Sequence, residues 1–291
     1  MDYKKVLITG GQGQLGYGLF YNFKNIFNVL ATSKNGNKSL NIKKLDITKY
    51  SEVKKTIYDF NPDIIINCAA ITDVDYCENH KSRAIQVNVD GLYNIIKGSN
   101  KDTKIIHFST DYIFDGSSHC YEENSFPNPI NYYGKTKLES ENLLRGKRNP
   151  YIIIRPNTVY SAGYNNFFTW VYNSLKENKS INVVSDQISN PSYVLSIVNA
   201  LIDMIIMNGQ GIYHHGSCDS ISRYDFSLKI ARKFKLNHNL INPVSSSELN
   251  QLSNRPRYSI LDTTKIEKDF NLTMNFVDES LNDIYKRIEN E

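Results

Sequence analysis

Short runs of apolar, often β-branched residues alternate with longer mixed stretches along the first half of the chain. The apolar runs have the length of strands, and the stretches between them are long enough for helices. This alternation predicts βαβ units and an α/β fold with a doubly wound parallel sheet, which binds ligands beyond the carboxyl ends of its strands. The predicted strands are residues 5–10, 28–33, 63–70, 104–110 and 151–156, and the predicted helices are 15–24, 51–59, 80–99 and 135–145.

The strict alternation fades after residue 157, where Asn, Ser and aromatic residues become frequent. Residues 191–207 then have the pattern of a buried helix, and residues 211–217 that of one more strand. We therefore predict a Rossmann domain over residues 1–157, completed by the segment 193–216. The segments 158–192 and 217–291 are predicted to form a smaller, interleaved substrate-binding lobe.

Charge and composition exclude several kinds of partner. The 34 Lys and Arg residues against 30 Asp and Glu residues give a formal charge of +4, without a block of one sign. This balance argues against a nucleic-acid or membrane partner, and the apolar run at the start is too short for a signal peptide or a spanning helix, so a cytoplasmic protein is expected. The cysteines (Cys68, Cys77, Cys120 and Cys218) form no CxxC pair, and His107, His214 and His215 show no ligand spacing, so neither a disulfide framework nor a metal site is predicted.

Three glycines follow the first predicted strand at equal spacing. Gly10, Gly13 and Gly16 lie three residues apart, at the opening of the first predicted helix. Such a turn allows a pyrophosphate to approach the backbone at the helix N-terminus and allows the helix to pack closely on the sheet. The context predicts a dinucleotide site, because a turn needed only for packing does not explain three regularly spaced glycines.

The residues after the second predicted strand favour NADPH, with NADH as the alternative cofactor. An acidic residue there accepts hydrogen bonds from the ribose of NAD and repels a 2'-phosphate, but this chain has Ser33 and Lys34. Lys34 can equally be an ordinary solvated lysine. Farther along, "KLDIT" puts Asp46 at a strand end where it can meet adenine, and the small side chains of Ala69 and Ala70 suit a close backbone approach to the cofactor.

Two adjacent tyrosines precede a lysine in the predicted helix 135–145. Residues four apart share one face of a helix, which pairs Tyr133 with Lys137 and leaves Tyr132 on another face. An ammonium group near a phenol favours the phenolate, and the lysine can also hold the nicotinamide ribose. Thr110, at the end of the fourth predicted strand, would place a hydroxyl at the same edge of the sheet. These residues suit the reduction of a carbonyl, with Tyr133 as the proton donor and Thr110 hydrogen-bonded to the carbonyl oxygen.

The combined motifs resemble the extended short-chain dehydrogenase/reductases, and more narrowly the dTDP-4-dehydrorhamnose reductases. The resemblance runs over nearly the whole chain and implies reduction by NAD(P)H of the 4-keto group of a nucleotide-linked 6-deoxyhexose, in deoxysugar synthesis for surface polysaccharide, by an enzyme compatible with a homodimer. It is carried by "TGGQGQLG", "LDIT", "PDIIINCAAITDVDYCE", "STDYIFDG", "NPINYYGKTKLESE", "DQISNPSYV", "GIYHHGS" and "RPRYSILDT". It implies catalytic roles for Thr110, Tyr133 and Lys137, and cofactor contacts for Gly10, Gly13, Gln14, Leu15, Gly16, Asp46, Ile47, Ala69, Ala70, Thr72, Tyr133 and Lys137. Ser33 departs from the family, which often has an acid there, and Ser33 and Lys34 join the predicted cofactor residues through the NADPH argument.

The substrate side departs from the family pattern at one position. Thr158 stands where these reductases commonly carry a tryptophan that contacts the substrate, which leaves the sugar open. A nucleotide diphosphate needs hydrogen bonds, base stacking and a cation, for which Phe167 and Arg257 are further candidates besides the main set. The predicted substrate residues are Thr110, Asp111, Tyr112, Asn157, Thr158, Asn166, Gln187 and Arg255.

Two other functions remain open at this point. Dehydration of a nucleotide sugar needs a Glu directly after the Asp that follows the threonine, and Tyr112 occupies that position, so dehydration is disfavoured. Epimerisation needs only the tyrosine and lysine, but it regenerates its cofactor. Regulatory subunits that resemble these reductases bind NADP without catalysis, and the retained Thr110, Tyr133 and Lys137 argue against that class.

Overall fold

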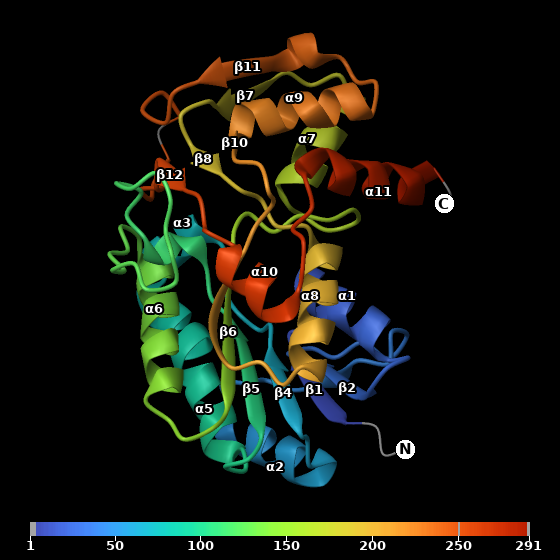
Figure 1. The fold of residues 1–291 in the computed structure, drawn as a ribbon, viewed down its shortest axis with the longest axis vertical. Helices are drawn as coiled ribbons and strands as arrows, with labels where there is room; N and C mark the ends of the chain where they lie inside the picture. Colours follow the sequence, from blue (N-terminus) through green and yellow to red (C-terminus); the bar gives the residue numbers. More distant parts are fainter. Residues whose placement is uncertain (1–3, 250, 290–291) are drawn as a thin grey trace.

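The structure, a computed structural model, describes residues 4–249 and 251–289, and within these ranges seven parallel strands form one sheet (Figure 1). Their order in the sheet is β3-β2-β1-β4-β5-β6-β9. The order in which strands are added therefore reverses between the neighbours β1 and β4, and such sheets bind ligands at this point. This confirms the predicted doubly wound fold. The strands are β1 (Lys5–Thr9), β2 (Asn28–Ser33), β3 (Lys43–Lys44), β4 (Ile64–Asn67), β5 (Lys104–Phe108), β6 (Tyr151–Pro156) and β9 (Gly211–His215).

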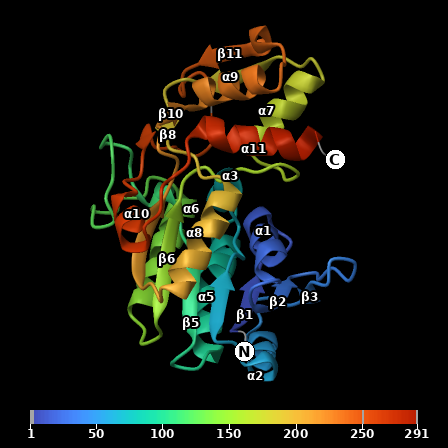
Figure 2. The same cartoon turned by 45° about the vertical axis from the view of Figure 1, so that its right-hand side comes forward.

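Helices cover both faces of the sheet. Figure 2 shows α1 and α8 on one side, and α2, α5 and α6 on the other. No helix within the described residues is both long enough and apolar enough to cross a bilayer. The helices of these two layers are α1 (Gln14–Phe23), α2 (Tyr50–Phe60), α3 (Val74–Asn79), α4 (Lys81–Ile85), α5 (Gly91–Gly98), α6 (Tyr132–Arg145) and α8 (Val194–Ile206); residues Gln86–Asp90 form a π turn that joins α4 to α5, and Asp111–Ile113 form a 3-10 turn after β5.

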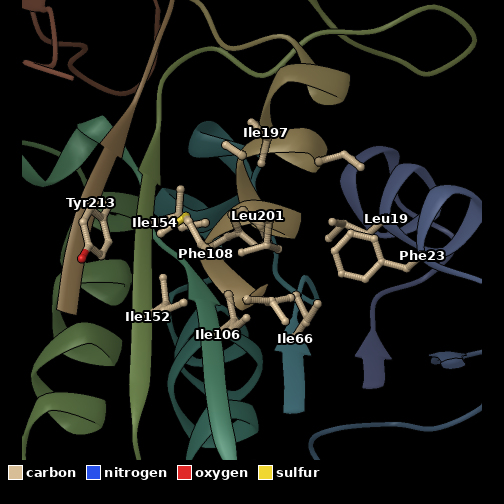
Figure 3. Close-up of a cluster of buried hydrophobic side chains, with 14 of the residues drawn as sticks. Leu19, Phe23, Ile66, Ile106, Phe108, Ile152, Ile154, Ile197, Leu201 and Tyr213 are labelled. Carbon is tan, nitrogen blue, oxygen red and sulfur yellow. The ribbon is translucent and has the colours of Figure 1, made fainter. Parts of the chain in front are cut away.

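The strands are apolar on both faces, as a sheet buried between two helical layers requires. In β5, Ile106 and Phe108 belong to the core beneath α1 and α8, whereas Ile105 packs on the opposite face with Leu92 and Leu144. Figure 3 shows the first of these cores, in which side chains of β4, β5 and β6 meet those of α1 and α8. The same alternation along β5 directs His107 toward the face that α5 and α6 cover.

A smaller lobe caps one end of the sheet domain (Figure 1). Its core gathers Phe168 and Val171, Phe226 and Ile230, and Leu281 from three helices around a two-stranded sheet. The elements of this part of the chain are α7 (Phe167–Lys176), β7 (Ile181–Val184), β8 (Ile188–Ser189), β10 (Ile221–Ser222), α9 (Arg223–Lys233), a 3-10 turn (His238–Leu240), β11 (Ile241–Val244), β12 (Tyr258–Ser259), α10 (Thr264–Phe270) and α11 (Val277–Glu289).

One helix from the segment predicted for the lobe packs on the sheet instead. Ile266 and Phe270 of α10 are buried in the core of the sheet domain, together with Met274 that follows them. The Phe270 ring lies edge-on against Tyr213 of β9, with the ring centroids 5.1 Å apart. The chain therefore crosses back from the lobe to the sheet domain before α11 returns to the lobe.

Two glycines allow helices to begin directly against the ends of strands. A β-carbon on Gly16 would lie 2.3 Å from the carbonyl oxygen of Gly10, and a β-carbon on Gly134 would lie 2.1 Å from that of Tyr112. Neither distance is compatible with a side chain, because the clashing atoms are backbone. Gly134 thereby brings the first turn of α6 against the 3-10 turn that follows β5.

We expect the substitution Gly134→Ala to push α6 away from this turn. Alanine favours helices by about 1 kcal/mol over glycine, but the clash with the Tyr112 carbonyl outweighs that gain, so the free energy of unfolding should fall by about 1–3 kcal/mol. Urea unfolding measures the change. Gly146→Ala, at the C-cap of the same helix where the nearest atom would be 3.4 Å away, is the control and should change the stability by less than about 0.5 kcal/mol. Equal stability of the two variants would contradict this interpretation.

Candidate active site

A cavity of about 470 Å³ opens beyond the carboxyl ends of the central strands. Its walls come from the glycine turn, from the segments after β4, β5 and β6, from α6 and from the lobe. Predicted residues from both the cofactor set and the substrate set meet there. These residues are Gly13, Gln14, Leu15, Gly16, Ala70, Thr72, Thr110, Asp111, Tyr112, Tyr133, Lys137, Thr158 and Asn166.

A second cavity, of about 400 Å³, adjoins the first on the side of the lobe. Tyr112, Asn166 and Arg223 line both cavities, so the two share part of their walls. The second cavity also has the predicted residues Gln187 and Arg255 in its wall. Together they form an elongated site that runs from the glycine turn to the lobe.

The glycine turn presents backbone N–H groups at the first cavity. Gly10 has a φ of 70°, and its carbonyl accepts a hydrogen bond of 2.9 Å from the N–H of Gly13, which is the N-cap of α1. Gly13, Gln14, Leu15 and Gly16 line the cavity, so the N-terminus of α1 lies at its wall, and helix N-termini stabilise anions. The side-chain nitrogen Nε2 of Gln14 is buried there without a hydrogen-bond partner.

Helix α6 places Tyr133 and Lys137 one turn apart on the cavity wall, as predicted. The helix begins at Tyr132, three residues earlier than predicted, because the Asn131 side chain caps it by accepting a 2.8 Å hydrogen bond from the N–H of Gly134. Tyr133 is 8% exposed and Lys137 is 2% exposed. Tyr132 lies outside the cavity wall, where the Lys81 amine is 5.3 Å from its ring centroid.

Burial governs the ionisation of both side chains. It raises the pKa of Tyr133 above its usual value, although the neighbouring Thr110 hydroxyl acts in the opposite direction. It lowers the pKa of Lys137 to about 8, with the charge of Glu141 opposing the change. Tyr133 is consequently a neutral phenol at neutral pH, able to donate a proton, and Lys137 titrates close to neutral pH.

The 3-10 turn after β5 carries a second group of polar side chains. The Thr110 hydroxyl accepts a hydrogen bond from the N–H of Tyr112 and donates one of 3.0 Å to the carboxylate oxygen Oδ1 of Asp111. Oδ2 of Asp111 is buried without a partner, and burial raises the pKa of this carboxyl to about 6. The Asp111 side chain is part of the cavity wall.

The end of β2 lies next to the glycine turn. The Ser33 hydroxyl donates to Oε1 of Gln12 at 2.7 Å and accepts from the N–H of Gly36, which ties the loop after β2 to the turn. Lys44 of β3 is the register partner of Ser33, so the two side chains share one face of the sheet. Lys34 follows Ser33 directly, and Lys44 pairs with it from β3.

Asp46 is engaged within its own loop. Its Oδ1 accepts hydrogen bonds from the N–H and the hydroxyl of Thr48. These bonds and the charges of Lys34 and Arg83 outweigh burial and keep the pKa of Asp46 below its usual value. Asp46, Ile47 and the other predicted cofactor residues Gly10, Ser33, Lys34 and Ala69 lie outside the walls of the two cavities.

Two of the predicted substrate residues have structural contacts instead. Asn157 is fully buried and its amide donates to the carbonyl of Ser259, so it joins β6 to β12 and does not line either cavity. Arg255 does line the second cavity, but its guanidinium is held by the Asp75 carboxylate at 3.1 Å. Thr158, at the position of the family tryptophan, has a φ of 24°, which is strained for a β-branched residue and is found mostly at functional sites.

The sequence prediction did not name Arg223. Arg223 lines both cavities, lies 5.1 Å from the ring centroid of Phe167, and has no carboxylate within salt-bridge distance among the described residues. The N-cap Ser222 before it marks the start of α9, and that capping signal could have placed Arg223 at a helix N-terminus. His107, predicted to be structural, has its Nε2 atom 3.2 Å from Nζ of Lys137.

Comparison with known proteins places these features in a family. The model of the RmlD substrate binding domain family matches residues 4–290. A dTDP-4-dehydrorhamnose reductase of Aggregatibacter actinomycetemcomitans is 35% identical over 92% of this chain and 94% of its own. A methionine adenosyltransferase 2 subunit beta of Xenopus tropicalis is 30% identical over 91% of this chain and 82% of its own.

A solved structure shows the same likeness in three dimensions. The dTDP-4-dehydrorhamnose reductase from Bacillus anthracis, in complex with NADP, superposes with a TM-score of 0.91 at 32% identity and covers 98% of this chain and 99% of its own. Sequence and fold agree over the same length, including the glycine turn, α6 and the lobe. The chain belongs to the RmlD substrate binding domain family.

Proposed function

We propose that this protein is a reductase that uses NADPH to reduce the 4-keto group of a nucleotide-linked 6-deoxyhexose, as a dTDP-4-dehydrorhamnose reductase does. One observation carries the proposal: Tyr133 and Lys137, buried and one helical turn apart, line the same cavity as the glycine turn. A nicotinamide cofactor bound along the turn supplies the hydride, and the chain supplies the proton. The NADP-bound relative and the named reductases support this assignment.

Each polar group of the cavity has a role in this reaction. Tyr133, a neutral phenol in its buried site, donates the proton to the carbonyl oxygen as the hydride arrives at carbon. Lys137 in its ammonium form holds the ribose hydroxyls of the cofactor and stabilises the phenolate that Tyr133 leaves. The Thr110 hydroxyl, which donates to Asp111 in the free protein, would turn to donate to the carbonyl oxygen, and the Asp111 carboxylate at the cavity wall would accept a hydrogen bond from a sugar hydroxyl.

The elongated shape of the site suits a nucleotide sugar. With the sugar beside Tyr133, the diphosphate extends toward the second cavity, and Arg223 at the junction supplies its cation. Arg223 is better placed for this than Arg255, whose charge Asp75 already neutralises. The aromatic rings of Phe167 and Trp170, with centroids 5.7 Å apart in the wall of the second cavity, offer the base a surface for stacking. The lobe built by residues 158–192 and 217–291, apart from α10, is thus the proposed substrate-binding unit.

A non-catalytic subunit is the second candidate, because the subunit beta of a methionine adenosyltransferase is similar over most of this chain. An epimerase is the third, because it needs the same tyrosine and lysine. The consumption of cofactor distinguishes the three candidates. A reductase oxidises NADPH, an epimerase regenerates its cofactor, and a non-catalytic subunit binds the cofactor without turnover.

The experiment that tests the function follows NADPH absorbance with a panel of 4-keto-6-deoxy nucleotide sugars, the dTDP-linked ones first, and identifies the products. Oxidation of one NADPH for each sugar reduced establishes the reductase. Tight NADPH binding without oxidation by any sugar of the panel would overturn it in favour of the subunit, and a sugar inverted without net oxidation would reveal an epimerase.

We expect Tyr133→Phe to lower kcat by a factor of about 10²–10⁴, because the variant lacks the proton donor. The affinity for NADPH should change by less than about threefold. Steady-state kinetics and fluorescence titration of NADPH measure the two quantities. Tyr132→Phe is the matched control, since Tyr132 is the adjacent tyrosine and lies outside the cavity wall. If Tyr132→Phe lost the activity and Tyr133→Phe kept it, the assignment of the donor would be wrong.

The lysines at the end of β2 should set the cofactor preference. Removing Lys34 and Lys44 together is expected to lower the ratio of kcat/KM for NADPH to that for NADH by about tenfold or more, because each ammonium can bind a 2'-phosphate at an exposed site. Lys43→Ala is the control, because Lys43 neighbours Lys44 in β3 and its side chain leaves the opposite face of the strand. An unchanged ratio in the double variant would show that other groups select the cofactor.

The Asp111 carboxylate, proposed to bind the sugar, should lower the stability of the free protein. Its folded-state pKa of about 6 lies above the ordinary 3.8, so the native state binds its proton more tightly and the ionised carboxylate destabilises the fold at neutral pH. Asp111→Asn should therefore raise the free energy of unfolding at pH 7.5 by about 1–3 kcal/mol and raise KM for the sugar. The gain in stability should shrink as the pH falls from 7 to 4, since wild-type Asp111 then becomes neutral; urea unfolding across this range checks it, and a less stable variant at pH 7.5 would contradict it.

A further inference from the structure

A row of hydrogen-bonded polar side chains crosses three strands beneath the cavity. Thr9 of β1, Asn67 of β4 and His107 of β5 are register partners on adjacent parallel strands, so their side chains point to the same face. The Thr9 hydroxyl donates to Oδ1 of Asn67 at 2.7 Å, and Nδ2 of Asn67 lies 3.2 Å from Nδ1 of His107. All three side chains are at most 2% exposed, so water does not compete for these bonds.

The row fixes the tautomer of His107. Oδ1 of Asn67 accepts from both the Thr9 hydroxyl and the N–H of Ala69, which sets the orientation of the amide and makes Nδ2 the donor toward the imidazole. Nδ1 of His107 is consequently the acceptor. Burial keeps the pKa of His107 well below its usual value, so the ring is neutral and its one proton is on Nε2.

The N–H at Nε2 points toward helix α6. It lies 2.9 Å from the Ser140 hydroxyl, which donates its own hydrogen to the carbonyl of Lys137 and so accepts from the imidazole. Nζ of Lys137 is 3.2 Å from the same Nε2 atom. An ammonium group and an N–H are both donors, so this contact is repulsive when Lys137 is charged and can become a hydrogen bond only when the amine is neutral.

We propose that His107, locked by Asn67 as the neutral tautomer protonated at Nε2, is a positioning residue for Lys137. It offers the lysine no acceptor on the side of the sheet, so the hydrogens of the ammonium are left for acceptors in the cavity. The role of Lys137 itself rests on the proposed function, whereas the tautomer of His107 is a property of the free protein. The roles proposed for Thr110, Tyr133 and Lys137 do not by themselves explain why Thr9, Asn67 and His107 form a buried polar row.

The other groups that face Lys137 do not replace this effect. Burial raises the pKa of the Cys68 thiol after β4, and it raises that of Cys77 in α3 to about 11, so both are neutral at neutral pH. Glu141, in the next turn of α6, is bound by Arg155 at 2.7 Å, and Tyr133 is a neutral phenol. The orientation of the imidazole therefore decides whether the sheet stabilises or repels the ammonium.

Long-range ¹H–¹⁵N NMR of the free protein tests the tautomer directly. The signals of the His107 ring are assigned by their loss in His107→Gln. Between about pH 6 and pH 8, they should show a protonated Nε2 and an unprotonated Nδ1. A ring protonated at Nδ1, or a charged ring, would overturn the proposal. This measurement needs neither cofactor nor sugar, so its failure is distinct from failure of the proposed function.

The consequence for Lys137 is tested by the pH dependence of NADPH affinity. Affinity in the wild type should fall above a pH of about 8, where Lys137 loses its charge. In His107→Gln the amide oxygen can rotate toward the ammonium and accept from it, so the fall should move upward by about one pH unit. His215→Gln removes another buried imidazole, in β9 and outside the cavity walls, and should leave the fall where it is.

Circular dichroism verifies that each variant is folded before its titration is used. A folded His107→Gln whose affinity falls at the same pH as the wild type would overturn the proposal, as would a shift of equal size in His215→Gln. If His107→Gln fails to fold, the His107 ring signals are assigned instead by their change in Asn67→Ser, which removes the donor to Nδ1. The tautomer can then still be measured in the wild type.

Discussion

The close contact between α6 and the turn after β5 is the constraint on which the site depends. Because Gly134 has no side chain, the helix begins within contact distance of the Tyr112 carbonyl, and Asn131 fixes this start by capping the helix. Tyr133 then lies beside the turn that carries Thr110, and the helical period brings Lys137 back to the same wall. The same device operates at Gly16, where α1 begins against the end of β1. Two backbone contacts thus place the glycine turn and Tyr133 on one cavity.

Burial gives these side chains their chemical character, and the surroundings decide which of them remain charged. Arg155 and Glu141 are as deeply buried as Lys137, but they neutralise each other through a bidentate pair at 2.9 and 2.7 Å. Lys137 and Asp111 have no such partner, and their pKa values move toward the neutral forms. Unpaired polar groups of this kind are common at functional sites, where a ligand can supply the missing partner.

Much of the fold and part of the site were predictable from local sequence. Alternating apolar runs predicted the strands of the sheet. The spacing of four residues predicted that Tyr133 and Lys137 share one face of a helix. Asn157 was misplaced and Arg223 was missed because their surroundings come from distant segments: Ser259 lies 102 residues from Asn157. The contacts of His107, a residue predicted to be structural, were also out of reach, since Asn67 lies 40 residues away. The return of α10 to the sheet was unpredictable for the same reason, since its apolar residues suit either core.

The repeated crossing of the chain between sheet and lobe explains why the site lies where it does. Thr158 enters the lobe directly from β6, and Arg223 begins a helix of the lobe at the wall of the same cavity. Asn157 anchors the first crossing to β12, and Asp75 holds Arg255 close to the loop after β4. The lobe is therefore fastened to the strand ends on both sides of the cavity. A hinge between two separate domains would leave the distance between Tyr133 and Arg223 variable, whereas these contacts set it within the fold.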